Sequence, residues 1–269
     1  FINLPRPQIK MRILEVCPFS AGICGVWTRV KEESTRLSKS GHDIMIFSSN
    51  KVKGTKEIAP KESKIGKVDI SRFQAKHLGG ESFMMWDYTK EALEFKPDVI
   101  IVHNYRQPHT IRALKIARKL HNNGIKTKVF LVTHAPFVEG NITRSFLATC
   151  IVKIYDLTIG PLTINKFDSI LPISNWEKKY LKKIGAKEEK IHYIPNGIPE
   201  EFFTFKKSPE QNKILFLGRI APKKKIETLI LAIPMIKENI QIEIVGPAEE
   251  EYLVYLKKLI SDNNLANRI

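Results

Sequence analysis

Cysteine is scarce in this sequence. The three cysteines, Cys17, Cys24 and Cys150, are odd in number and form no Cys-x-x-Cys pair. Disulfide frameworks and structural zinc sites both need paired or clustered cysteines, and the seven histidines add no metal-ligand spacing. The sequence therefore argues against a disulfide-stapled fold, predicts no metal site, and favours a reducing compartment.

Long hydrophobic runs are missing as well. A membrane-spanning helix needs about 20 consecutive apolar residues, and the nearest candidate, residues 146–164, is broken by Lys153, Asp156 and the pair Gly160–Pro161. Residues 1–10 contain two prolines and no continuous apolar segment, which does not fit a secretory signal. We treat them as a leader or extension, because the first predicted strand opens at Met11, and we expect a cytoplasmic protein.

Acidic side chains are too few to balance the basic ones. Lys and Arg number 44 against 28 Asp and Glu, a formal net charge of +16. Such a charge suits nucleic acid, an anionic membrane surface or phosphate-rich ligands, and a Lys-rich proteome would produce it too. No Walker loop, Ser/His/Asp arrangement or basic motif interleaved with aromatics is present, so we expect no nucleic-acid partner. Peripheral contact with the inner membrane face stays open.

Short apolar segments alternate with amphipathic helical segments along the chain. The predicted strands are residues 11–17, 43–48, 98–103, 128–133, 169–173 and 191–194, and the predicted helices are residues 26–39, 109–121 and 175–184. Strands that are apolar throughout and alternate with helices predict a parallel sheet covered on both faces.

The same pattern restarts after a polar segment. Two further strands and two helices are predicted at residues 213–217, 226–237, 241–245 and 250–262. Because a doubly wound domain normally has five or six strands, we predict an incomplete second domain. The predicted α/β organisation is a first domain at residues 11–200, a linker at 201–212 and a partial second domain at 213–269.

Two loops follow predicted strands at the edge where ligands of parallel sheets bind. The first contains Gly25, which allows close approach of backbone N–H groups to a ligand. In the second, Gly218 and Arg219 end a strand, and Lys224 follows five positions later. Two cations in such a loop can neutralise a nucleoside diphosphate and stabilise it as a leaving group.

Four segments carry a resemblance to the retaining glycosyltransferases of family 4. They are residues 11–48, the pair PDVIIVHN and FLVTHAPF, the run from FDSILPISNWEKKYL to KIHYIPNGIPEEFF, and ILFLGRIAPKKKIETLILA followed by IEIVGPAEEE. The resemblance implies the GT-B architecture of two Rossmann-like domains. It also implies transfer of a hexose from a UDP- or GDP-linked sugar to a hydroxyl acceptor, lipid-linked or on a glycan, with retention and without a metal or other cofactor.

The resemblance also assigns roles to residues. Arg219 and Lys224 would grip the donor diphosphate, Gly25 and Gly246 would lie against the donor, and His134 would lie beside the sugar and acceptor. His103 and Asn196 are weaker candidates on the acceptor side.

Departures from the family pattern are Cys24 and Lys225, each at a position where a glycine is usual, and a paired-glutamate motif with no counterpart here. A sugar-nucleotide epimerase and a non-catalytic basic binding protein remain alternatives, since fold alone does not decide function.

Overall fold

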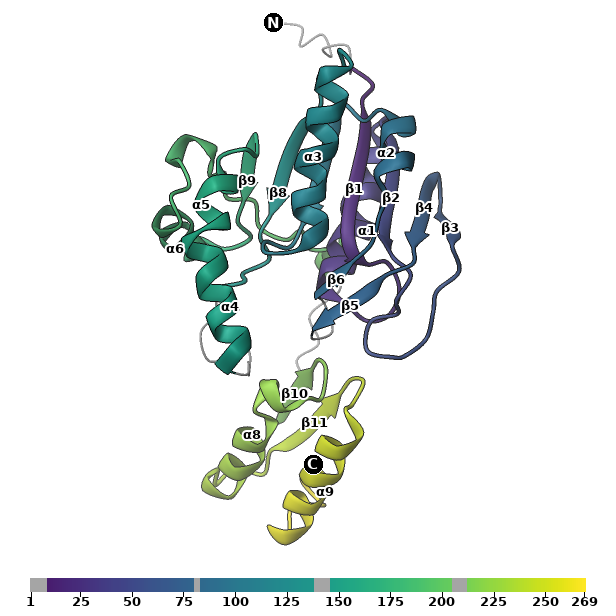
Figure 1. Ribbon diagram of the computed structural model, residues 1–269. Helices are drawn as coiled ribbons and strands as arrows, with labels where there is room; N and C mark the ends of the chain where they lie inside the picture. The colour runs from purple at the N-terminus through teal and green to yellow at the C-terminus, as the bar shows by residue number, and fades with distance from the viewer. Residues whose placement is uncertain (1–8, 80–82, 138–145, 205–211) are drawn as a thin grey trace, which may run out of the picture. The chain divides into compact units, whose positions relative to one another are not determined.

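The computed structural model describes residues 9–79, 83–137, 146–204 and 212–269. The chain divides into two compact units. The first is built from residues 1–138 and 144–199, and the second from residues 139–143 and 200–269. Both units are α/β, with parallel strands joined through helices (Figure 1).

The first unit is organised around a seven-stranded sheet with the order β3-β4-β2-β1-β7-β8-β9. The strands are β1 (Arg12–Phe19), β2 (Asp43–Ser49), β3 (Glu62–Ile65), β4 (Val68–Phe73), β7 (Val99–His103), β8 (Lys128–Val132) and β9 (Ser169–Leu171). Neighbouring strands run parallel except for β3, which pairs antiparallel with β4. The predicted parallel sheet of apolar strands is therefore confirmed.

Helices and a small hairpin complete this unit. They are α1 (Gly25–Lys39), α2 (Thr89–Phe95), α3 (Pro108–Asn122), α4 (Phe146–Leu157), α5 (Ile159–Ile164), α6 (Glu177–Lys183), the 3-10 turn η1 (Glu188–Lys190), and the hairpin of β5 (Lys76–Gly79) with β6 (Phe83–Met85). Helix α3 begins at Pro108, whose fixed φ and missing N–H suit the first helical position. None of the described helices has the length and hydropathy that a membrane-spanning segment needs.

Side chains of the central strands alternate between two cores, because successive residues of a strand point to opposite faces. Leu14 and Val16 of β1 pack with α3 in one core, whereas Ile13 and Cys17 pack with Val30 of α1 in the other. Helices α1 and α3 thus cover opposite faces of the sheet. Position 15, between Leu14 and Val16, belongs to the face that α1 covers.

The second unit contains two parallel strands, β10 (Lys213–Leu217) and β11 (Gln241–Val245), in its described residues. The other elements of this unit are α7 (Glu201–Thr204), η2 (Pro222–Lys224), α8 (Ile226–Ala232), η3 (Ile233–Met235) and α9 (Glu250–Asp262). An aliphatic core that includes Ile226, Ile230 and Ile242 joins α8 and α9 to the strands. This is the strand–helix alternation that the sequence predicts.

The structure differs from the predicted elements, or adds to them, in three places. Residues 191–194 form no strand, and only a single bridge joins Ile170 to Ile191. The segment predicted as a linker contains the one-turn helix α7. No strand or helix was predicted for residues 50–95, yet this region contributes two strands of the main sheet, a hairpin and α2.

Candidate functional site

Three titratable side chains meet at the carboxyl end of the central strands. Glu15 lies on β1, His103 ends β7, and His134 follows β8. In the register of the sheet Glu15 is opposite Ile101, so His103, two residues further along β7, points to the same face. Strand alternation thus brings a carboxyl group and an imidazole together on the face that α1 covers.

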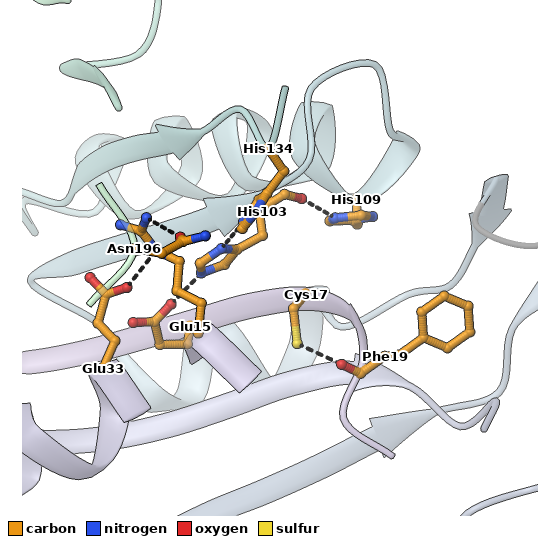
Figure 2. A network of polar contacts seen from close by, with 9 residues as sticks. Glu15, Cys17, Phe19, Glu33, His103, His109, His134 and Asn196 are labelled. Atoms are coloured by element: carbon orange, nitrogen blue, oxygen red, sulfur yellow. Dashed lines mark hydrogen bonds and ion pairs between the residues drawn. The ribbon is translucent and has the colours of Figure 1, made fainter. Parts of the chain in front are cut away.

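The three side chains form a continuous hydrogen-bonded line, the carboxyl–histidine chain (Figure 2). His103 Nε2 lies 2.7 Å from Glu15 Oε2, and His103 Nδ1 lies 2.9 Å from His134 Nε2. Glu15 and His103 have no exposed surface, whereas His134 is partly exposed. His103 is therefore held from both sides, behind His134.

Burial controls the protonation of this chain, because removal from water disfavours the charged form of each group. Burial raises the pKa of Glu15 to about 8, and the nearby Arg29 guanidinium opposes that rise. Burial lowers the pKa of His103 to about 4. It also lowers the pKa of His134 far below the usual range for histidine. At neutral pH the carboxyl–histidine chain thus consists of a protonated Glu15 carboxyl group and two uncharged imidazoles.

A groove near the carboxyl–histidine chain runs between α1 and residues 194–199. Its volume is about 540 Å³, and Gly25, Arg29, Glu33 and Asn196 are among its lining residues. Arg29 is 9% exposed and donates from Nη1 to Asn196 Oδ1 at 3.0 Å and from Nε to Glu33 Oε2 at 3.2 Å. Arg29 thereby ties the Pro-Asn-Gly turn to the first helix.

One group of residues in this region could hold a cation. Ligand atoms of Glu15, Glu33 and His103 lie within 4.8 Å of one another. Glu33 is already paired with Arg29, however, and His103 Nε2 with Glu15. A metal ion would have to displace both contacts and sit beside a guanidinium, which the charge on Arg29 disfavours.

The turn that carries His134 is backbone-strained. His134 and Ala135 both have positive φ, 56° and 53°, a region that costs residues with a Cβ about 1–2 kcal/mol each. Strain of this kind persists only where surrounding contacts enforce it.

Glu177 supplies most of that enforcement. This side chain is fully buried at the start of α6 and accepts five hydrogen bonds. Oε2 accepts from Thr133 Oγ1 at 2.5 Å and from Ala135 N at 2.8 Å, on either side of His134. Oε1 accepts from the backbone N–H groups of Ile173 and Ser174 and from the Ser174 hydroxyl, at 2.9–3.1 Å. One carboxylate therefore joins the loops that follow β8 and β9.

Arg106 holds the same turn from the other side. It donates from Nη1 to the carbonyl oxygen of Pro136 at 2.8 Å and pairs through Nε and Nη2 with Asp156 of α4. Arg106 itself has φ 69°. The position of His134 is thus fixed from α4 and α6 together.

A second constellation lies at the strand ends of the second unit. Gly246 has φ 150°, and a Cβ there would lie 1.9 Å from the carbonyl oxygen of Gly218, so the loops after β10 and β11 touch through backbone alone. Arg219, which follows Gly218 in the sequence, pairs with Glu249 at 3.1 Å, and 29% of its side chain is exposed. Lys224 ends η2 and is exposed. Three of the predicted donor residues, Gly218, Arg219 and Gly246, are thus adjacent.

The remaining predicted residues differ in how well their surroundings fit the predicted roles. Gly25 is the first residue of α1, and a Cβ built there meets nothing within 4 Å. The strained glycine of this loop is instead Gly22, with φ 81°. Asn196, predicted on the acceptor side, accepts a hydrogen bond from Arg29. His103, predicted there too, has no surface that an acceptor could reach.

Sequence reasoning missed Glu15, Arg29 and Glu177. Two of these leave a signal in the sequence. Glu15 is the one charged residue between Ile13 and Cys17 of an otherwise apolar strand, and a buried charge needs a partner. Ser174 and Glu177 have the Ser-x-x-Glu spacing of a capping box, which predicts that the glutamate reaches back to the backbone of the serine.

Two family profiles match this chain. The profile of Glycosyltransferase Family 4 matches residues 23–202, and that of Glycosyl transferases group 1 matches residues 197–269. The chain belongs to Glycosyltransferase Family 4. It is a glycosyltransferase, which favours the transferase over the epimerase and the binding protein. A comparison with curated protein sequences finds no match.

Solved structures of GT-B glycosyltransferases share the fold. Sucrose-phosphate synthase from Thermosynechococcus elongatus matches with a TM-score of 0.63 and 15% identity, over 96% of this chain and 69% of that one. HepE from Anabaena, in complex with UDP and glucose, gives 0.63 and 14%, over 96% and 68%. A glycosyltransferase from Rickettsia africae gives 0.60 and 19%, over 97% and 67%. At these identities the likeness establishes the fold alone.

Proposed function

We propose that this glycosyltransferase moves a hexose from a UDP- or GDP-linked donor to a hydroxyl acceptor with retention at the anomeric carbon. The observation that carries the proposal is the backbone contact between Gly218 and Gly246, which presents Arg219 at the strand ends of the second unit. This segment lies in the part of the chain matched by the group 1 profile. HepE, a structure of the same fold, is in complex with UDP-glucose in one crystal.

Arg219 can give up its ion pair with Glu249 and bind a phosphate group instead. Its ion pair with Glu249 is partly exposed on both sides, 29% and 45%, and such pairs contribute less than about 1 kcal/mol. A diphosphate offers a doubly charged, bidentate acceptor to the same guanidinium. In the proposed reaction Arg219 and Lys224 neutralise the negative charge that builds up on the departing diphosphate. For His134 we propose the role that the family resemblance implies, a contact with the sugar.

The proposal is tested by incubating the protein with a panel of nucleotide sugars and measuring released nucleoside diphosphate. The anomeric configuration of any product, read by NMR, decides between retention and inversion. Failure to release diphosphate from every UDP- and GDP-sugar, with or without added acceptors, would overturn the proposal.

Substitution of the two cations tests their role. Arg219→Ala and Lys224→Ala should each lower kcat by about 10²- to 10³-fold, since they stabilise charge that grows in the transition state. Lys223→Ala is the matched control, because Lys223 is an exposed neighbour on the same 3-10 turn. Equal turnover in all three variants would show that the diphosphate is held by other groups.

We further propose that the protein associates with an anionic membrane surface. Helix α4 has no buried residue, and Phe146, Leu147, Ile151, Ile154 and Leu157 are each at least 55% exposed. Exposed apolar side chains gathered along one helix mark an interaction site. With a net charge of +16, anionic lipid is the partner whose charge fits, and each engaged Lys or Arg adds roughly 1 kcal/mol.

Flotation with lipid vesicles tests this second proposal. The protein should float with anionic vesicles at low salt and be released as ionic strength rises, whereas phosphatidylcholine vesicles should not retain it. Ile151→Asp in α4 should abolish flotation. Val254→Asp is the control, since Val254 is an apolar residue of α9 in the second unit that is at least as exposed (63%) as Ile151 (55%). Equal binding of both variants, or equal recovery on neutral and anionic lipid, would refute the α4 contact.

A further inference from the structure

The bond between His103 and His134 constrains the protons of the whole carboxyl–histidine chain. A hydrogen bond between two imidazole nitrogens needs one nitrogen that donates and one that accepts. His103 Nδ1 and His134 Nε2, 2.9 Å apart, are therefore a donor–acceptor pair in one direction or the other. The direction depends on which nitrogen of His103 is protonated, and that depends on Glu15.

Two arrangements satisfy both hydrogen bonds. When Glu15 is protonated it donates to His103 Nε2, His103 Nδ1–H donates to His134 Nε2, and the remaining proton of His134 is on Nδ1. When Glu15 is ionised, it accepts from His103 Nε2–H, His103 Nδ1 accepts from His134 Nε2–H, and His134 Nδ1 is bare. The outer nitrogen of His134 is a donor in the first arrangement and an acceptor in the second.

We propose that Glu15 is a positioning residue that acts through His103 to decide whether His134 Nδ1 offers a proton or a lone pair to the bound substrate. The mechanistic use of this nitrogen rests on the proposed function. Within the described residues Nδ1 has no hydrogen-bond partner, whereas Nε2 is held by His103. Nδ1 is thus the nitrogen left for a ligand.

The two arrangements differ by one proton, and the conversion balances along the chain. The Glu15 proton passes to His103 Nε2, the His103 Nδ1 proton passes to His134 Nε2, and the His134 Nδ1 proton leaves to an acceptor such as water or a substrate oxygen. The negative charge remains on Glu15, where the guanidinium of Arg29 faces it. Glu15 Oε1 is buried without a hydrogen-bond partner in the described residues, which is compatible with a carboxyl group that is protonated in this state.

The groups around Glu15 set the pH at which the conversion occurs. Burial raises its pKa to about 8, Arg29 opposes that rise, and the neighbouring carboxyl group of Glu33 repels an ionised Glu15. The titratable or charged groups that face Glu15 are Arg29 and Glu33 from α1, His103 from β7, His134 after β8, and Cys17 on β1 itself. The conversion therefore falls close to physiological pH.

Nitrogen NMR of the protein with ¹⁵N-labelled histidine measures the tautomer directly. The His134 signals are assigned by their absence in His134→Asn. Nδ1 of His134 should have the shift of a protonated, pyrrole-type nitrogen below the Glu15 pKa of about 8 and of a bare, pyridine-type nitrogen above it. Nε2 should change in the opposite sense. A His134 tautomer that stays constant across this range in the wild-type protein overturns the proposal without need of any variant.

Two variants separate Glu15 from its surroundings. Glu15→Gln cannot ionise, so the His134 tautomer should become independent of pH. Glu33→Gln is the matched control, because Glu33 belongs to the same cluster but does not bond to a histidine. Its loss removes a repulsive carboxylate and frees Arg29, so the tautomer change should persist at lower pH. Persistence of the change in Glu15→Gln would contradict the role of Glu15.

The NMR outcome and the proposed activity can fail independently. A tautomer that titrates in a protein without transferase activity would refute the proposed function and leave the role of Glu15 standing. An active enzyme in which the His134 tautomer does not change with pH would support the proposed function and refute the role of Glu15. If both hold, kcat of the wild-type enzyme should change with pH near 8, the pKa of Glu15, and kcat of Glu15→Gln should not. Loss of packing alone would not remove this pH dependence.

Discussion

Replacement of Glu177 by glutamine should destabilise the turn that carries His134, because the side-chain NH₂ group takes the place of one acceptor oxygen. Glutamine keeps the shape of the side chain but exchanges one acceptor oxygen for an NH₂ group. All five hydrogen bonds to Glu177 come from donors, two on Oε2 and three on Oε1. With the amide oxygen at the Oε1 position, Thr133 can rotate its hydroxyl to accept, but the N–H of Ala135 meets another donor.

The expected loss follows from that count. One buried backbone N–H without a partner costs about 1–3 kcal/mol, and the remaining bonds weaken when the charged acceptor becomes neutral. We therefore expect Glu177→Gln to lower the free energy of unfolding by about 2–4 kcal/mol, a large share of the ~5–15 kcal/mol typical of a domain. Thr133→Val removes one donor of the five and should cost about 1 kcal/mol.

Tryptophan fluorescence during urea unfolding measures this effect in the first unit alone, because Trp27, Trp86 and Trp176 all lie there. Glu188→Gln, which alters an exposed carboxylate, is the control and should stay within about 0.5 kcal/mol of wild type. The same variant of Glu177 should lower kcat, since His134 is no longer held. A Glu177→Gln protein as stable as the control would show that the five contacts do not hold the turn.

Two further predictions concern stability. The pKa of Glu15 is raised to about 8, so from pH 6.5 to pH 8 the folded state keeps a proton that the unfolded state has already lost. Stability should fall over this range by roughly 2 kcal/mol, at 1.4 kcal/mol per pH unit. The lowered pKa of His103, about 4, acts in the opposite sense below pH 6.5 and there offsets the further gain that Glu15 would give on acidification. Urea unfolding of Glu15→Gln should lack the alkaline decline, and an unchanged decline would contradict the burial argument. Gly22→Ala should cost well over 1 kcal/mol, since φ is 81° and the new Cβ would lie 2.5 Å from the Lys53 carbonyl oxygen. Gly25→Ala should leave stability unchanged and weaken donor binding, and equal melting temperatures for these two variants would refute the contrast.

Sequence reasoning captured the strongly apolar strands and failed where polar residues build structure. Strands β1, β7 and β8 could be predicted because a short, wholly apolar run between two amphipathic helical segments is typical of a buried strand. Strand β4 was missed because its alternation, Val68 to Phe73, lies among lysines and mixes buried with half-buried residues. The expected strand at residues 191–194 failed because only one residue of it pairs with the sheet.

The candidate site was predictable only in part. Gly218, Arg219 and Gly246 come directly after predicted strands in the sequence, and such positions meet at one edge of a parallel sheet. Their proximity could therefore be predicted. The carboxyl–histidine chain depends on the register of β1 against β7, and register is not visible in a single sequence. Glu177 joins segments 42 and 44 residues apart in the chain, and only the fold brings such segments together.

The two outer strands of the large sheet also bear on how this protein behaves at high concentration. Unpaired N–H and C=O groups on an outer strand are a template for pairing with other molecules, and short, charged outer strands resist it. Strand β3 has four residues, Glu62 to Ile65, with Glu62 and Lys64 exposed and Lys64 paired to Asp69 at 2.8 Å. Strand β9, on the opposite side, has three residues and a bridge to Ile191 beyond it. Both outer strands are therefore poor partners for a second copy. Apolar substitutions at Glu62 and Lys64 should promote aggregation before they affect the site.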